Sequence, residues 1–301
     1  MIPFTLRQLE YAVAVAEERS FRRAAERCHV SQPALSAQIQ QLEDHLELRI
    51  FERDRRGVLI TEAGREVVSR AERLLIQSRD LAELAARRRG PLDGILHLGV
   101  IPTIAPYALP ELVAQLHVWH PRLRLRLREG RTEDLVADLE KGTLDLLLLA
   151  AEADLGHATV AEIARDPFIL AVAPGHRLAS KKTVRERDLV DEPVLVLEDG
   201  HCFGDQALAV CRRNGASDAA DFRASSLTTL VQMVAAGEGI TLLPELAVPV
   251  ENRRATLELR DLGPRGPHRT LVLAWRPTSP HDAAYRDLAA QLRVWWPTRH
   301  D

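Results

Sequence analysis

The sequence is poor in cysteine, with only three among 301 residues. So few cysteines exclude a disulfide-stabilised scaffold and leave free, reactive or metal-binding thiols as the options. No apolar run reaches the roughly 18 residues that a membrane-spanning helix needs, and the N-terminal segment has glutamates where a signal peptide would have its apolar core. We therefore expect a protein that stays in the cytoplasm and has no membrane partner.

The sequence also lacks a strong net charge, since the formal value is −3 at pH 7. Residues 1–90 carry 16 Arg against 14 Asp and Glu, and the remainder carries 24 Lys and Arg against 29 Asp and Glu. A nucleic-acid partner must therefore be inferred from a motif and not from bulk charge. The hydrophobic share of 46% and the length of 301 residues predict a globular protein of two or three domains.

The chain changes character near residues 87–94, where "RRRGPLDG" follows a long helical pattern. The residues before this point are predicted to be almost entirely helical. After it, short runs such as "ILHLGVI", "LDLLLLA" and "FILAVA" alternate with helical patterns. This alternation predicts parallel strands in an α/β architecture.

The N-terminal segment predicts a helix-turn-helix. An amphipathic helix is expected over about residues 6–18, and Ser20 is expected to cap a short second helix whose inward residues include Cys28. Ser31 suits the N-cap of a third helix, with Pro33 in its first turn. That helix is expected to bury Leu35, Ile39, Leu42 and Leu46 and to turn Gln32, Ser36, Ala37 and Gln40 outward. Small polar side chains at its N-terminal end suit contact with bases in a DNA major groove.

The next stretch, "LRIFERDRRGVLITEAG", predicts a two-stranded wing around residues 55–57. Such a wing would bring Arg53, Arg55 and Arg56 near phosphates or into a minor groove. Two alternatives stay open at this point: the wing is a solvated charged turn, or the helix-turn-helix is an ordinary helical hairpin.

A long helix is predicted from Thr61 to about Arg89. Small or apolar residues recur along it at spacings of 3 and 4: Gly64, Val67, Ala71, Leu74, Ser78, Leu81 and Ala85. This heptad seam predicts pairing with the same helix of a second chain, as symmetric half-sites on DNA require. Burial of the seam against its own domain is the alternative.

Two cysteines, Cys202 and Cys211, lie nine positions apart in "LEDGHCFGDQALAVC". Asp205 is expected to cap a helix that contains Cys211, and the positive end of that helix, with neighbouring His201, favours the thiolate of Cys202. A thiolate attacks a peroxide O–O bond to give a sulfenic acid, which a second thiol captures as a disulfide. Nine residues of helix advance about 13.5 Å, whereas a disulfide needs Cα atoms within about 4.4–6.8 Å. The helix must therefore partly unwind before the bond closes, which would make it a switch.

The cysteine pair has three other interpretations. In the first, the two residues are unrelated core side chains. In the second they belong to a zinc site, although the paired C-x-x-C spacing and a fourth ligand are missing. In the third the chain is a thiol peroxidase, which would not explain the N-terminal DNA-binding unit.

The N-terminal residues resemble a known family. The segment "LRQLEYAVAVAEERSFRRAAERCHVSQPALSAQIQQLEDHLELRIFERDRRGVLITEAG" is similar along its whole length to the N-terminal domain of LysR-type transcriptional regulators. The resemblance implies DNA binding, a dimerising long helix, and tetramers as the usual assembly. It places Ser31, Gln32, Pro33 and Ser36 at the operator and Arg53 and Arg56 on the wing.

Two C-terminal segments, "GILHLGVIPTIAPYALPELV" and "RASSLTTLVQMVAAGEGITLLPELAV", resemble the LysR-type effector domain, a pair of subdomains like those of periplasmic binding proteins. Thr103, Thr132 and Ser226 are then candidates for lining the effector cleft, with simple helix caps as the alternative. The implied organisation is a winged helix-turn-helix at 1–60, a dimerising linker helix at 61–90, and a regulatory domain at 91–301 with subdomains at 91–163 plus 268–301 and at 164–267.

The region around the two cysteines resembles the peroxide-sensing OxyR branch of that family, and the likeness extends over essentially the whole chain. It implies that Cys202 is the peroxidatic cysteine and Cys211 the resolving one. The positions that surround the reactive thiol in that branch are occupied here by Thr103, Thr132, His201, Asp205 and Arg269. Gly204 departs from the pattern, because many relatives carry Arg at this place.

The resulting interpretation is a regulator of antioxidant genes that is not an enzyme and needs no cofactor or metal. Its implied partners are double-stranded promoter DNA, RNA polymerase, hydrogen peroxide, a cellular thiol reductant, and further copies of the chain in a homodimer or homotetramer. The alternatives are a LysR-type regulator gated by a small carboxylate-like metabolite and a thiol peroxidase.

Overall fold

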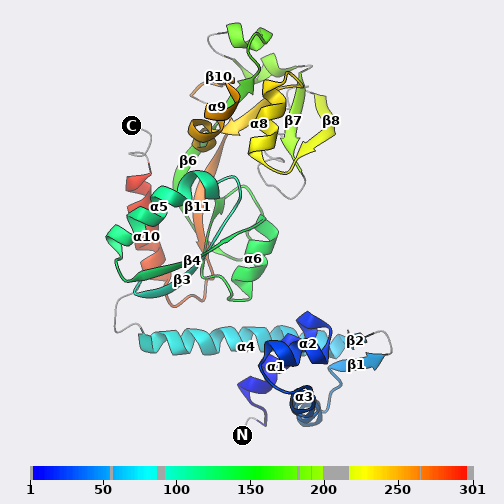
Figure 1. Cartoon of the computed structure of the whole chain (residues 1–301). Helices are drawn as coiled ribbons and strands as arrows, with labels where there is room; N and C mark the ends of the chain where they lie inside the picture. The colour runs from blue at the N-terminus through cyan, green and yellow to red at the C-terminus, as the bar shows by residue number, and fades with distance from the viewer. Residues whose placement is uncertain are drawn as a thin grey trace. The chain divides into compact units, whose positions relative to one another are not determined.

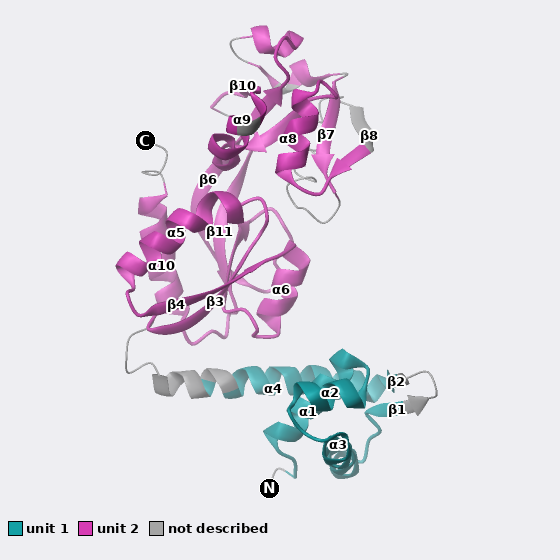
Figure 2. Cartoon of the chain, viewed as in Figure 1, with its two compact units in different colours: residues 1–88 teal, residues 89–301 magenta. Residues whose placement is uncertain are grey.

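The computed structural model describes residues 3–54, 57–86, 92–181, 184–190, 192–198, 217–264 and 266–296. The chain forms two compact units, residues 1–88 and 89–301 (Figure 2). The predictions for Arg55, Arg56 and Arg89 lie outside the described residues. So do those for His201, Cys202, Gly204, Asp205 and Cys211, together with the predicted helix that contains Cys211.

The first unit begins with three helices, α1 (Leu6–Glu18), α2 (Phe21–Arg27) and α3 (Gln32–Leu46) (Figure 1). The Ser20 hydroxyl accepts a hydrogen bond from Arg23 N at 3.4 Å, and the Ser31 hydroxyl accepts one from Ala34 N at 3.4 Å. Both side chains thereby satisfy a backbone N–H that the first helical turn leaves unpaired. The three predicted helices and the two predicted serine caps are confirmed.

The helices enclose a small apolar core. Phe21 of α2 meets Phe51 edge to face, with ring centroids 5.9 Å apart. Cys28 is partly buried and packs against this core, as expected for a small core residue. Burial raises the pKa of the Cys28 thiol above its ordinary value, and Arg27 opposes this effect only in part.

The raised pKa of Cys28 predicts a slow reaction with alkylating reagents. A thiol must be deprotonated to attack iodoacetamide, and at pH 7 a raised pKa leaves less thiolate. Peptide mapping of native protein after a short pulse of iodoacetamide should find Cys28 alkylated more slowly than the thiol of a short unstructured peptide. Equal rates would contradict the buried setting of this residue.

The first unit ends in a hairpin and a long helix. Strands β1 (Phe51–Asp54) and β2 (Gly57–Ile60) pair antiparallel, which confirms the two predicted strands of the wing. Helix α4 (Glu62–Ala86) follows. Gly64 lies so close to the backbone just before β1 that a Cβ on it would come 2.2 Å from the Ile50 carbonyl oxygen, so only glycine fits there.

The predicted heptad seam divides into two stripes. Among its first residues, Gly64 and Ala71 are buried, and Ala71 and the partly buried Val67 contribute to the core of the first unit. Leu74 and Leu81 instead leave 42% and 68% of their surface exposed. Burial against its own domain, the alternative interpretation, therefore accounts for these first seam residues, because α4 also has an apolar face turned into the first unit. Pairing of the more exposed seam residues with a second chain stays a prediction.

The second unit contains a seven-stranded sheet with the order β10–β6–β11–β5–β3–β4, and β9 also pairs with β6. Its strands are β3 (Gly94–Val100), β4 (Leu123–Glu129), β5 (Leu146–Ala150), β6 (Thr159–Val172), β9 (Thr241–Pro244), β10 (Glu258–Asp261) and β11 (His268–Trp275). Strands β7 (Pro193–Leu197) and β8 (Ser217–Ala224) form a separate parallel pair. Around the strands lie α5 (Ala105–Trp119), α6 (Thr132–Glu140), α8 (Leu227–Ala235), α9 (Val248–Ala255), α10 (Asp282–Trp295) and the 3₁₀ turns η2 (Arg177–Ser180), η3 (Glu186–Leu189) and η4 (Glu245–Ala247).

The α/β architecture is confirmed, but the sheet is mixed and not parallel. Strands β3, β4 and β5 are parallel, whereas β11 pairs antiparallel with both β5 and β6. Figure 1 shows β6 and β11 running between the part of the unit with α5, α6 and α10 and the part with β7, β8 and α8. The run "FILAVA" thus belongs to an antiparallel strand. The boundary expected at residues 163–164 falls inside β6.

No helix in the described part of the chain combines the length and the apolar composition that crossing a membrane requires.

Candidate functional sites

The outward face of α3 is the first candidate site. Leu35, Ile39 and Leu42 are buried in the core, whereas Gln32, Ala37 and Gln40 are exposed and Ser36 is half-buried. Ser31 and Pro33 lie exposed at the start of the helix. The predicted division of α3 into a core face and a polar face is confirmed. The polar face presents short hydrogen-bonding side chains, which allow an approach close enough to reach base edges.

The wing residues are only partly described. Arg53 lies in β1 opposite Val58 of β2. Arg56 lies outside the described residues, so the contribution of these two arginines stays a prediction.

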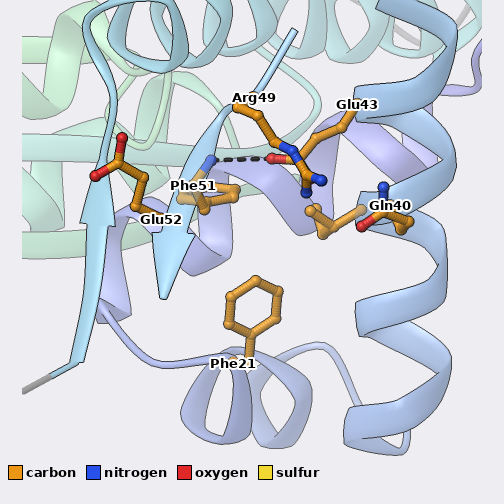
Figure 3. Close-up of a pocket in the computed structure, with 7 residues that line it drawn as sticks. Phe21, Gln40, Glu43, Arg49, Phe51 and Glu52 are labelled. Carbon is orange, nitrogen blue, oxygen red and sulfur yellow. Dashed lines mark hydrogen bonds and ion pairs between the residues drawn. The ribbon is translucent and has the colours of Figure 1, made fainter. Parts of the chain in front are cut away.

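A buried carboxylate ties α3 to the wing. The Oε1 atom of Glu43 accepts hydrogen bonds from the backbone N–H groups of Ile50 at 2.7 Å and Phe51 at 3.0 Å. Its Oε2 atom lies 3.5 Å from the guanidinium of Arg49, which is largely exposed. This group lies beside a hollow of about 480 Å³, which is lined by Phe21, Ile39, Gln40, Glu43, Arg49, Phe51 and Glu52. Figure 3 shows how these side chains lie. Glu43 therefore fixes the polar face of α3 relative to the first strand of the wing.

Replacing Glu43 with alanine should destabilise the first unit by about 1–3 kcal/mol, because two buried backbone donors would lose their acceptor. Urea unfolding followed by far-ultraviolet circular dichroism measures this effect. Glu66→Ala is the matched control, since Glu66 forms an exposed pair with Arg70 one turn away, and such pairs contribute only about 0.3–0.5 kcal/mol. Equal losses of unfolding free energy in the two variants would contradict the stabilising role of the Glu43 hydrogen bonds.

The second candidate site is a buried polar network in the second unit. Arg269 of β11 is 0% exposed and Asp166 of β6 is 4% exposed, and the two residues face each other in the sheet register. Arg269 donates from Nε to Asp166 Oδ2 at 2.9 Å, from Nη1 to the Thr103 hydroxyl at 2.7 Å, and from Nη2 to the Thr103 carbonyl at 3.0 Å. The structure thus brings together two of the predicted site residues, Thr103 and Arg269, and adds Asp166.

Thr132 lies at the neighbouring strand end. Strands β3 and β4 are parallel neighbours, and Gly130 N donates to the Val100 carbonyl at 3.2 Å just beyond their ends. Thr103 follows β3 and Thr132 opens α6, so both lie beyond the carboxyl ends of adjacent parallel strands, where ligands of α/β proteins bind. Thr132 is only 7% exposed, and its hydroxyl has no hydrogen-bond partner among the described residues. A buried hydroxyl of this kind is suited to a small polar ligand.

An ion pair connects this place to the start of the cysteine segment. Arg131, which precedes Thr132, lies 3.5 Å from the carboxylate of Glu198, the residue after β7. Cys202 follows Glu198 by four residues, and four residues extend at most about 14 Å. Cys202 itself lies outside the described residues, so its distance from Thr132 stays a prediction.

Ser226 is the N-cap of α8 and is exposed. Its hydroxyl accepts a hydrogen bond from Thr229 N at 3.2 Å and lies 3.1 Å from the Thr229 hydroxyl. A capping role accounts for both contacts. Its role in an effector cleft stays a prediction.

Family models match both parts of the chain. A model described as "Bacterial regulatory helix-turn-helix protein, lysR family" matches residues 6–65, and a model described as "LysR substrate binding domain" matches residues 89–296. The second match alone covers more than half of the chain. The chain belongs to the LysR family.

Within the LysR family, the chain is similar to proteins named OxyR over nearly its whole length. It is 44% identical to the "DNA-binding transcriptional dual regulator OxyR" of Escherichia coli, over 96% of this chain and 95% of that protein. A structure of a full-length OxyR variant from Pseudomonas aeruginosa has a TM-score of 0.76 at 35% identity and covers 97% of this chain and 95% of its own. A hydrogen-peroxide-bound OxyR variant from Corynebacterium glutamicum has a TM-score of 0.68 at 32% identity, with coverages of 99% and 94%.

Sequence reasoning missed Glu43, Arg131 and Asp166 in this LysR-family chain. The sequence does contain a sign of the role of Glu43, because this acidic residue lies on the inward face of α3 between Ile39 and Leu46. The sequence contains no such sign for Asp166, since its partner Arg269 is 103 residues away along the chain. No cluster of three or more potential metal-ligating side chains occurs within the described ranges.

Proposed function

We propose that this LysR-family chain binds promoter DNA and regulates transcription in response to hydrogen peroxide, which it senses by oxidation of Cys202. The observation that carries the proposal is the 44% identity, over 96% of the chain, to a transcriptional regulator named OxyR. Relatives matched over a similar share of the chain are named hydrogen peroxide-inducible genes activators.

The chemistry needs only the two thiols and peroxide. The Cys202 thiolate attacks one oxygen of hydrogen peroxide, so that an S–O bond forms and the O–O bond breaks. The departing oxygen leaves as hydroxide and takes up a proton to become water, and Cys202 becomes a sulfenic acid. The Cys211 thiolate then attacks the Cys202 sulfur, and the sulfenic oxygen leaves as a second water. In total two thiols and one peroxide give one disulfide and two waters.

The buried threonines support a role in holding peroxide. The Thr103 hydroxyl receives a hydrogen bond from Arg269 and retains its own proton, while the Thr132 hydroxyl has no partner among the described residues. Each can donate to a peroxide oxygen. His201 and Asp205 belong to the same segment as Cys202, and we assign them to the environment of the thiol.

The switch and the DNA-binding surface complete the proposal. A disulfide between Cys202 and Cys211 would constrain residues 202–211, which lie between β7 and β8. DNA would be read by Ser31, Gln32, Pro33 and Ser36, with Arg53 and Arg56 on the wing. Two chains would pair through the exposed stripe of α4 that carries Leu74 and Leu81, in a homodimer or homotetramer. RNA polymerase and a cellular thiol reductant would be further partners.

DNA selection followed by footprinting tests the function and does not require the target genes to be identified first. Reduced protein is used to select duplexes from a random pool, and the selected DNA is footprinted with reduced and peroxide-treated protein. We expect a two-half-site footprint whose pattern changes after peroxide treatment. An absence of selective DNA binding would contradict the proposed role in transcription. A footprint that is the same before and after peroxide treatment would contradict the proposed peroxide sensing.

A further inference from the structure

Asp166 contacts one edge of the Arg269 guanidinium at two nitrogen atoms. Its Oδ2 atom accepts from Nε of Arg269 at 2.9 Å and lies 2.8 Å from Nη2, so one carboxylate oxygen contacts two nitrogens along one edge of the guanidinium. The guanidinium is planar, and its N–H groups point in fixed directions. Fixing one edge therefore also fixes the direction of the N–H groups that reach Thr103.

This geometry decides what the Thr103 hydroxyl can do. A hydroxyl has one proton to donate and two lone pairs that accept. Because Arg269 Nη1 donates to the Thr103 oxygen at 2.7 Å, the hydroxyl proton must point elsewhere. The structure shows no hydrogen bond from this proton to any residue that it describes. The buried Thr103 hydroxyl can therefore donate a hydrogen bond, while its oxygen is held in position by the Arg269 guanidinium.

We propose that Asp166 is a positioning residue for the reaction with peroxide, acting through Arg269 to hold the Thr103 hydroxyl as a donor to a peroxide oxygen. The inference rests on the proposed function and extends it by a residue on β6. The donated hydrogen bond orients the peroxide while the Cys202 thiolate forms the S–O bond and the O–O bond breaks. In this role Asp166 acts through Arg269 and does not itself contact the peroxide or the Cys202 sulfur.

The second oxygen of Asp166 makes the role specific to a carboxylate. Its Oδ1 atom accepts a hydrogen bond from Leu246 N in η4 at 3.0 Å. An asparagine at this position has one acceptor oxygen and one NH₂ group, so it cannot accept from both Arg269 and Leu246 in the same geometry. Asp166→Asn therefore keeps the shape of the side chain but releases one of its two partners.

The test compares two oxidants of the same thiol. Hydrogen peroxide needs a donor to its oxygen, whereas diamide accepts the thiolate at an N=N bond and has no need of the Thr103 hydroxyl. We expect Asp166→Asn in the full-length reduced protein to lower the second-order rate constant with peroxide by about 10- to 100-fold, because small misplacements of reacting groups have effects of this size. The rate constant with diamide should change by less than about 2-fold under the same argument.

Asp145→Asn is the matched control. Asp145 is a partly buried carboxylate in the same unit, and it accepts from the backbone N–H of His97 at 2.8 Å and contacts the His97 ring at 3.0 Å. Its replacement makes the same chemical change away from Arg269. Both rate constants should therefore stay at the wild-type level.

A double-variant cycle with Thr103→Val tests whether Asp166 acts through Thr103. If it does, Asp166→Asn adds no further loss of peroxide rate once the hydroxyl has been removed, because coupled residues are not additive. Should Asp166→Asn fail to fold, Asp166→Glu keeps the charge, displaces the guanidinium, and is expected to show the same selective loss.

The outcomes separate this inference from the proposed function. Equal slowing with peroxide and diamide, or full additivity with Thr103→Val, would overturn the role of Asp166 while leaving the sensor intact. A wild-type protein whose thiols do not react with peroxide would overturn the sensor and the role of Asp166 together.

Discussion

Replacing Cys202 with serine should abolish the entire peroxide-dependent change in the DNA footprint while leaving the binding of the reduced protein to selected DNA unchanged. A serine hydroxyl is not ionised at neutral pH and cannot be oxidised to a sulfenic acid. The two functions separate because Cys202 lies in the unit of residues 89–301, whereas α3 and the wing lie in the unit of residues 1–88.

The other two cysteines provide the controls for this prediction. Cys211→Ser should still form a sulfenic acid at Cys202, which dimedone captures, but should form no intramolecular disulfide. Cys28→Ser should respond as the wild type does, because Cys28 is a partly buried residue of the first unit. A Cys202→Ser protein that still responds to peroxide would contradict the sensor and would favour a regulator gated by a metabolite.

Replacing Arg269 with methionine should lower the free energy of unfolding of the second unit by about 3–5 kcal/mol, since Asp166 would remain as a buried charge without its counter-ion. Arg269 is 0% exposed, so water cannot take over its role. All four tryptophans of the chain, Trp119, Trp275, Trp295 and Trp296, belong to this unit. Urea unfolding followed by tryptophan fluorescence therefore reports on the relevant part of the protein.

An exposed ion pair in the same unit serves as the control. Arg122 lies 2.8 Å from Asp93 with 75% of its side chain exposed, and such pairs contribute about 0–1 kcal/mol. Arg122→Met should therefore have a much smaller effect than Arg269→Met. The double variant Arg269→Met with Asp166→Leu should recover much of the stability, because it removes both buried charges, yet it should remain slow with peroxide. Similar losses in the two single arginine variants would contradict the buried network.

The sequence was sufficient for features that depend on local patterns. The bounds of α1 to α3, the caps Ser20 and Ser31, and the polar face of α3 follow from helical periodicity and from side chains that bond to backbone groups a few residues away. The cap at Ser226 has the same origin. For these elements, the interactions that decide the structure lie within one or two turns.

Other features depend on partners that are distant in the chain. The strand containing "FILAVA" has the apolar run of a parallel strand, but its direction is set by pairing with β11 about 100 residues later. The pair of Asp166 and Arg269 arises from that register. The two faces of α4 likewise depend on whether α1 and the core cover them, which the spacing of apolar residues alone does not determine.

Peptide mapping by mass spectrometry, after treatment of the reduced full-length protein with less than one equivalent of hydrogen peroxide, tests the central claim most directly. The account predicts a disulfide that joins the peptide containing Cys202 to the peptide containing Cys211, with Cys28 still reduced. Unlinked Cys202 and Cys211 in protein that has consumed peroxide, or a disulfide through Cys28 instead, would contradict it.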